Sequence, residues 1–101
     1  MRAKRKDANH NAIEDHLERL GWSVFDTSGL GYGFPDLLVG KPGFCAVVEI
    51  KDGSKPPSDR KLTPAEEQFK RNWTGPYVLA TSEDDAMTQL EALYARWWRS
   101  A

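Results

Sequence analysis

The sequence predicts an α/β sandwich in which a mixed four-stranded sheet is flanked by helices. Apolar residues first recur at helical spacing, and three short stretches rich in β-branched and aromatic residues follow. Two later helical segments enclose a last short strand, so the order is helix, three strands, helix, strand, helix. A chain of 101 residues suits one hydrophobic core, and we expect a single domain over residues 1–101.

The first half of the chain is expected to hold one helix and three strands. Ile13 and Leu17 lie one turn apart in the helix predicted at residues 8–20, and Gly21 follows as a stop signal. The strands are predicted at residues 22–25, 34–39 and 44–51. Alternating glycines make residues 28–33 a loop, and residues 40–43 are expected to form a turn.

The second half begins with residues 52–61, whose loop composition predicts a mobile segment. A helix then starts with Thr63 as N-cap, Pro64 at the first helical position and Glu66 three residues after the cap. This helix is expected to end near residue 73. A strand at residues 77–80 and a final helix from residue 82 to residue 99 follow it.

Composition narrows the class of protein. Hydrophobic residues make up 40% and charged residues 29%, as in ordinary globular domains. Because no apolar run approaches the ~18 residues of a membrane span and no signal peptide is recognisable, we expect a cytoplasmic protein that does not enter membranes. Cys45 is the single cysteine and sits in an apolar run, which predicts a buried thiol. One cysteine and two histidines argue against a structural zinc site.

The net charge of −1 does not indicate a polyanion partner, but the basic residues gather in two stretches. They form a basic N-terminal tip at residues 1–7 (Arg2, Lys4, Arg5, Lys6) and a second group at Lys51, Lys55, Arg60 and Lys61. Such patches either bind phosphates or are solvated loops.

The hairpin brings two acids together. If residues 40–43 form the loop, Asp36 lies opposite Val47, and alternation puts Glu49 and Lys51 on the same face as Asp36. Glu49 is then the diagonal neighbour of Asp36, with Cα atoms roughly 7–8 Å apart. A slip of one residue would separate the two acids.

This arrangement has two interpretations. Glu49 and Lys51 can form a simple surface pair, worth at most ~1 kcal/mol. Alternatively, two carboxylates can hold Mg²⁺, which prefers oxygen ligands, while the ammonium orients an attacking water and offsets charge developing on a phosphate.

The order of Gly33-Phe34-Pro35-Asp36 and Glu49-Ile50-Lys51 resembles the PD-(D/E)XK nuclease signature. The chain as a whole is similar to the small stand-alone VRR-NUC proteins often encoded by phages and prophages. The similarity includes the opening Asp7-Ala8-Asn9-His10, the segment Leu62-Thr63-Pro64 and the helix end Trp73-Thr74-Gly75-Pro76. It implies a restriction-endonuclease-like α-β-β-β-α-β core with an extra C-terminal helix.

The resemblance also implies residue roles. Asp36 and Glu49 would bind Mg²⁺ or Mn²⁺, the carbonyl of Ile50 would be a further ligand, and Lys51 would position the nucleophilic water. Possible accessory residues on the first helix and on the helix after the active strand are His10, Asn9, Glu14, Glu66 and Gln68. For Glu66, a capping-box role is an equal alternative.

The function these features predict is a metal-dependent endodeoxyribonuclease of a bacterial host or phage, with branched or junction DNA as a possible substrate. The expected DNA contacts are Gly31, Tyr32, Gly33, Lys55, Arg60 and Lys61, although the glycine loop can equally be a flexible connector. The alternative function is an inactive DNA-binding or dimerising module with the same fold.

The last helix carries two apolar stripes. The first is expected in the core and comprises Ala86, Leu90, Leu93 and Trp97. The second, formed by Met87, Tyr94 and Trp98, is either a homodimer contact or further core packing. A homodimer would present two active sites related by a two-fold axis, which suits cleavage of paired strands.

Overall fold

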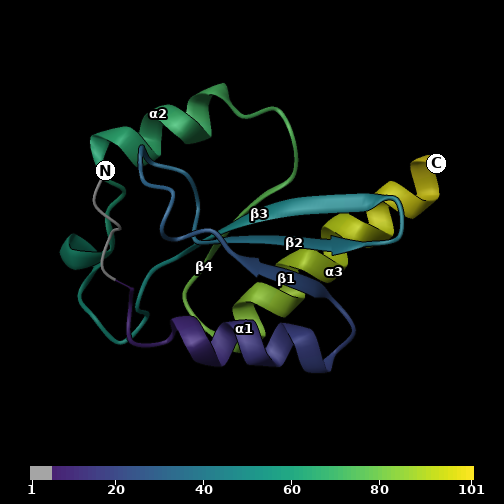
Figure 1. The fold of residues 1–101 in the computed structure, drawn as a ribbon, viewed down its shortest axis with the longest axis horizontal. Coiled ribbons are helices and arrows are strands. Elements are labelled where there is room, and N and C mark those ends of the chain that lie inside the picture. Colours follow the sequence, from purple (N-terminus) through teal and green to yellow (C-terminus); the bar gives the residue numbers. More distant parts are fainter. Residues whose placement is uncertain (1–5) are drawn as a thin grey trace.

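The computed structural model describes residues 6–101 and confirms the predicted α/β fold with its C-terminal helix (Figure 1). Its elements are α1 (His10–Arg19), β1 (Ser23–Asp26), β2 (Leu37–Lys41), β3 (Phe44–Ile50), the 3₁₀ helix η1 (Pro57–Arg60), α2 (Pro64–Asn72), β4 (Tyr77–Ala80) and α3 (Glu83–Ser100). Three members of the predicted basic tip, Arg2, Lys4 and Arg5, lie outside the described residues.

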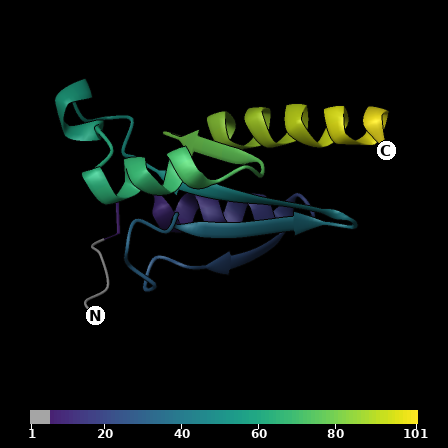
Figure 2. The same ribbon diagram turned by 90° about the horizontal axis from the view of Figure 1, so that it is seen from above.

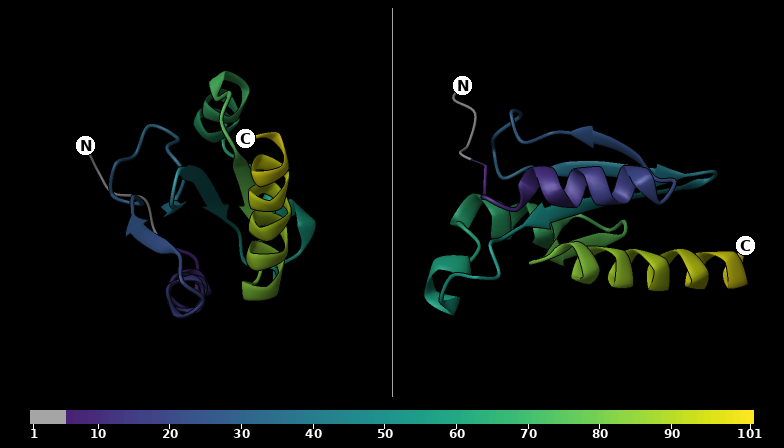
Figure 3. Two further views of the ribbon diagram at one scale, coloured as in Figure 1. Left: turned by 90° about the vertical axis from the view of Figure 1, so that its right-hand side faces the viewer. Right: turned by 90° about the horizontal axis from the view of Figure 1, so that it is seen from below.

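The four strands form one mixed sheet in the order β1-β2-β3-β4. The pairs β1–β2 and β2–β3 are antiparallel, whereas β3 and β4 run parallel. A parallel pair needs a long crossover, and the segment that contains α2 supplies it. Helices α1 and α3 lie against one face of the sheet, and α2 lies on the opposite side (Figures 1 and 3). The long helix α3 continues past β4 toward the turn that joins β2 to β3 (Figure 2).

The hydrophobic core fills the space between the sheet and the pair α1 and α3. From β3, the alternate residues Ala46, Val48 and Ile50 are fully buried there. Ile13 and Leu17 meet them from α1, and α3 contributes Leu90 among others. Because these side chains occupy every second position of β3, the intervening positions, including Glu49, face the other way.

The hairpin register differs from the prediction by two residues. Lys41 pairs with Phe44, so the turn contains two residues and not the four expected at 40–43. The second turn residue, Gly43, has φ of 75°, and an added Cβ would lie 2.9 Å from the ring of Trp97 on α3. The β2 strand also begins at Leu37, not at residue 34. Since side chains alternate with period two, a shift of two residues keeps every side chain on its predicted face.

Two further expectations were wrong. The lone thiol of Cys45 is exposed: alternation along β3 puts it on the face opposite the core, and it lies nearer the turn than Val47 and Glu49, the buried residues of that face. The segment 52–61 is not loop throughout, since residues 57–60 form η1. The start of α2 is as predicted, with Thr63 and Glu66 in a complete capping box. Within residues 6–101, no helix combines the length and apolar character needed to cross a membrane.

Candidate metal centre

Asp36 and Glu49 converge at the ends of β2 and β3, on the face opposite the core. Leu37 pairs with Val48, so the register continued by one residue puts Asp36 directly opposite Glu49. The backbone N–H of Ile50 donates to Oδ2 of Asp36 at 2.8 Å. Both acids are buried, with exposed fractions of 3% for Asp36 and 1% for Glu49. The two predicted metal ligands are therefore closer neighbours than the diagonal pair that the sequence suggested.

Lys51 and Glu66 complete this cluster from β3 and α2. The Nζ of Lys51 lies 2.9 Å from Oε1 of Glu66 and 3.9 Å from Oε2 of Glu49. The same Oε1 of Glu66 accepts the N–H of Thr63 at 2.9 Å, which closes the capping box. The capping role and the contact with Lys51 therefore coexist in Glu66, which is 5% exposed.

Helix α2 reaches the cluster because the glycine loop packs tightly against its first turn. Gly33 has φ of 79°, and a Cβ built there would lie 2.2 Å from the carbonyl oxygen of Ala65. The next residue, Phe34, packs edge-to-face on Phe69 with ring centroids 5.1 Å apart. The loop that leads into Asp36 and the helix that carries Glu66 are thus held against each other.

Asp7 and Asn9 tie the start of α1 to the same region. The side-chain amide of Asn9 donates to the carbonyl oxygens of Lys51 at 3.2 Å and of Thr81 at 3.0 Å. Burial raises the pKa of the Asp7 carboxyl; the ammonium of Lys51 opposes this rise and the charge of Asp36 adds to it. Asp7 is thus a further acid beside the cluster; the sequence pointed to it only as part of the opening Asp7-Ala8-Asn9-His10, without a role of its own.

The accessory candidates His10 and Glu14 face Asp26 at the end of β1. Nε2 of His10 lies 3.6 Å from a carboxylate oxygen of each acid, and these three residues form a group that could hold a metal ion. Burial disfavours ionised Asp26, but hydrogen bonds from Lys6 and Ser28 outweigh it and hold the Asp26 pKa well below its usual range. Sequence patterns gave no signal for Asp26. An accessory role of His10 and Glu14 in catalysis stays a prediction.

The residues predicted to contact DNA lie in two regions. Tyr32, between Gly31 and Gly33, is 85% exposed and has φ of 57°. Lys55 lines a hollow of about 500 Å³ together with Lys6, Asp7 and Ala8. The other two basic candidates, Arg60 and Lys61, lie at the end of η1 and just after it.

The predicted dimer stripe on α3 is divided by the fold. Met87 is buried in the core, so for this residue the alternative of core packing holds. Tyr94 is half-buried against Trp22 and Phe44, whereas Trp98 is 58% exposed. A homodimer through α3 stays a prediction, and Trp98 is the member of the stripe that remains accessible for it.

The donor set of the cluster fits a hard divalent cation. Carboxylate oxygens of Asp36 and Glu49 are the ligand type that Mg²⁺ and Mn²⁺ prefer, and the adjacent backbone of Ile50 can add a carbonyl oxygen. No protein-family model, curated protein or solved structure matches this chain. The assignment of a function therefore depends on this geometry and on the motifs in the sequence.

Proposed function

We propose that this protein is a metal-dependent endodeoxyribonuclease that hydrolyses phosphodiester bonds of DNA at the Asp36–Glu49–Lys51 cluster. The observation that carries the proposal is the burial of two carboxylates directly opposite each other, with an ammonium beside them. Burying an ionised carboxylate costs free energy unless cations or hydrogen-bond donors compensate it, and two buried acids side by side with an ammonium are a common arrangement at functional sites. A simple surface pair of Glu49 and Lys51 does not fit, because Glu49 is 1% exposed.

Each residue has a defined task in this proposal. Asp36 and Glu49 would hold the cation, which when bound polarises the scissile phosphate and promotes ionisation of a water. Lys51 has three N–H donors, and one of them points to Glu66. The same ammonium lies 3.9 Å from Oε2 of Glu49, and in this proposal it orients the attacking water and offsets negative charge as the phosphate becomes pentavalent. Glu66 is a positioning residue, since it fixes the ammonium.

The substrate is proposed to be DNA, with branched DNA as the preferred form, and the site of action the cytoplasm. The protein would act as a homodimer through α3 when it cuts both strands of a junction. The basic segment that contains Lys55, Arg60 and Lys61 leads directly into α2 and can contact phosphates on one side of the cluster.

The decisive experiment measures cleavage of a labelled flap and a four-way junction by wild type, Asp36→Asn and Asp59→Asn. Asparagine keeps an oxygen that can accept the Ile50 N–H, so the hairpin is preserved, and the exposed Asp59 is a matched control. We expect Mg²⁺-dependent cleavage that EDTA abolishes and that Asp36→Asn lowers by about 10²-fold or more.

The same experiment identifies the competing functions. Folded Asp36→Asn protein that cleaves as fast as wild type would remove the proposed metal centre. Salt-sensitive DNA binding without cleavage in Mg²⁺ or Mn²⁺ would identify the inactive DNA-binding module instead.

A further inference from the structure

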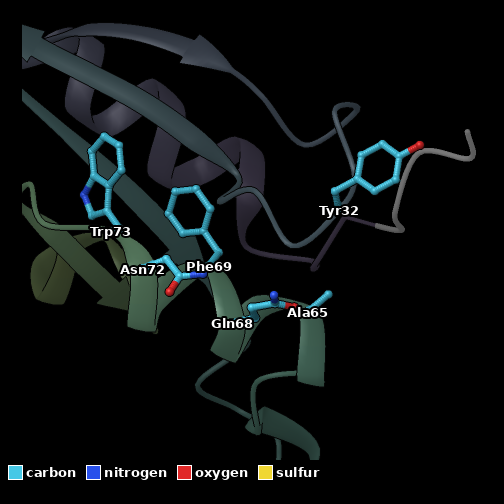
Figure 4. Close-up of a pocket in the computed structure, with 6 residues that line it drawn as sticks. All are labelled: Tyr32, Ala65, Gln68, Phe69, Asn72 and Trp73. Carbon is cyan, nitrogen blue, oxygen red and sulfur yellow. The ribbon is translucent and has the colours of Figure 1, made fainter.

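A groove of about 440 Å³ lies between the glycine loop and α2. Figure 4 shows the ring of Phe69 on α2 and the ring of Trp73 just after its end, with the ring of Tyr32 on the loop at the opposite side of the groove. The lining residues are Tyr32, Ala65, Gln68, Phe69, Asn72 and Trp73. We propose that this groove binds an unpaired nucleobase of the DNA strand that is cut, an inference that rests on the proposed nuclease function.

The aromatic side chains form a prearranged stacking surface. Phe69 and Trp73 stack with centroids 5.5 Å apart and an angle of 22° between their planes. Phe34 also supports Phe69 through an edge-to-face contact. The indole N–H of Trp73 donates to the carbonyl oxygen of Pro76 at 3.1 Å, which fixes the ring. Because these rings are already held in place, little side-chain entropy is lost when a planar ligand stacks on them.

The backbone of Tyr32 adopts a conformation that is unfavourable for a residue with a bulky side chain. Its φ of 57° is uncommon for such a residue and costs free energy. The flanking Gly31 and Gly33 also have positive φ, and the contact of Gly33 with α2 fixes the loop. The result is an exposed aromatic ring on a constrained backbone next to the groove.

The chemistry of the groove matches a base better than a phosphate. Its six lining residues carry no formal charge, whereas phosphates are bound by cations and backbone N–H groups. Gln68 and Asn72 are exposed amides, and each offers both donors and an acceptor to the edge of a base. Aromatic faces with amide groups beside them are how proteins hold unpaired bases.

The position of the groove connects it to the cluster. Glu66, which contacts Lys51, and Phe69 are three residues apart on α2, a rise of about 4.5 Å along the helix axis. Stacked nucleotides are about 3.4 Å apart along a strand, so the base in the groove would lie within a few nucleotides of the scissile phosphate. In a duplex both faces of a base are covered by neighbours, so the groove selects a strand that is unpaired at this point.

The test uses a flap substrate with 2-aminopurine placed in turn at the first four unpaired nucleotides, in EDTA to prevent cleavage. Binding of wild type should quench the fluorescence at one position, since stacking quenches this base. An abasic nucleotide at that position should weaken binding by about 5- to 150-fold. Tyr32→Asn, which suits a positive φ, should weaken binding within the same range and remove the quenching.

Leu30→Asn is the matched control, because Leu30 is 49% exposed on the same loop but does not line the groove. If Tyr32 and the base interact, the abasic flap and Tyr32→Asn together should cost little more than either alone. Fully additive losses, or an abasic flap bound as tightly as the intact flap, would overturn the groove assignment. If the groove assignment fails but the flap is still cleaved in Mg²⁺, the nuclease proposal stands. If the flap is bound but never cleaved, the nuclease proposal is refuted. If the protein binds no DNA at all, the nuclease proposal and the groove proposal are both refuted.

Discussion

Replacing Gly33 by alanine should separate the glycine loop from α2 and thereby damage both stability and catalysis. The new Cβ would lie 2.2 Å from the carbonyl oxygen and 2.4 Å from the carbonyl carbon of Ala65, and 2.9 Å from the N of Glu66. All three are backbone atoms, so no side chain can rotate out of the way. A left-handed conformation costs alanine roughly 1–2 kcal/mol, and overpacking adds about 1–3 kcal/mol. We therefore expect Gly33→Ala to lower the free energy of unfolding by about 2–5 kcal/mol.

The assay is urea and thermal unfolding, followed by metal-dependent cleavage under conditions in which the variant is folded. For a domain of this size, 2 kcal/mol corresponds to a melting temperature at least about 8 °C lower. Gly29→Ala is the matched control, because a Cβ at Gly29 meets no heavy atom of the described chain within 4 Å. The reasoning is refuted if Gly33→Ala unfolds within about 0.5 kcal/mol of wild type and cleaves equally fast.

Two further predictions concern single carboxylates. Glu66→Gln keeps an oxygen to accept the Thr63 N–H but loses the charge beside Lys51. It should slow cleavage about 10- to 100-fold with a nearly unchanged melting temperature. The same change at the exposed neighbour, Glu67→Gln, should alter neither the rate nor the melting temperature. Equal rates for the two variants would contradict the positioning role. The pKa of Asp26 is lowered in the folded state, so its stabilising contribution is present above the ordinary carboxyl pKa of about 4 and is lost as pH falls further. Asp26→Asn should therefore be less stable at pH 7 and lose less stability between pH 7 and pH 3, as measured by urea midpoints; an unchanged pH dependence would contradict this.

The exposed groove and the buried cluster give α2 two tasks at once. Its first turn fixes Lys51 through Glu66, and its following turns present Phe69 and the amides to solvent. A change that tilts α2 should therefore affect the rate of cleavage and the binding of the unpaired strand together. Variants confined to the solvent-exposed residues of the groove should change binding alone.

Local sequence determined the order of the elements, because the signals that set them act within a few residues. The Thr63–Glu66 capping box forms between neighbours, and alternation along β3 fixes which side chains share a face with Glu49. That alternation is also why Asp36 and Glu49 could be paired from the sequence although the assumed turn was two residues too long. An even error in register leaves every face unchanged.

Only the tertiary structure decided which distant groups meet. The contact between Glu66 and Lys51, the approach of Asp7 to Asp36 and the grouping of His10 with Asp26 join elements whose relative positions no local pattern specifies. The exposure of Cys45 is also decided by tertiary packing. An apolar run predicts that a strand is buried, but it does not predict how far along the strand other elements pack against it. Capping hydrogen bonds and strand alternation depend on residues that are close in sequence. The meeting of distant side chains on a sheet depends on how whole helices and strands pack.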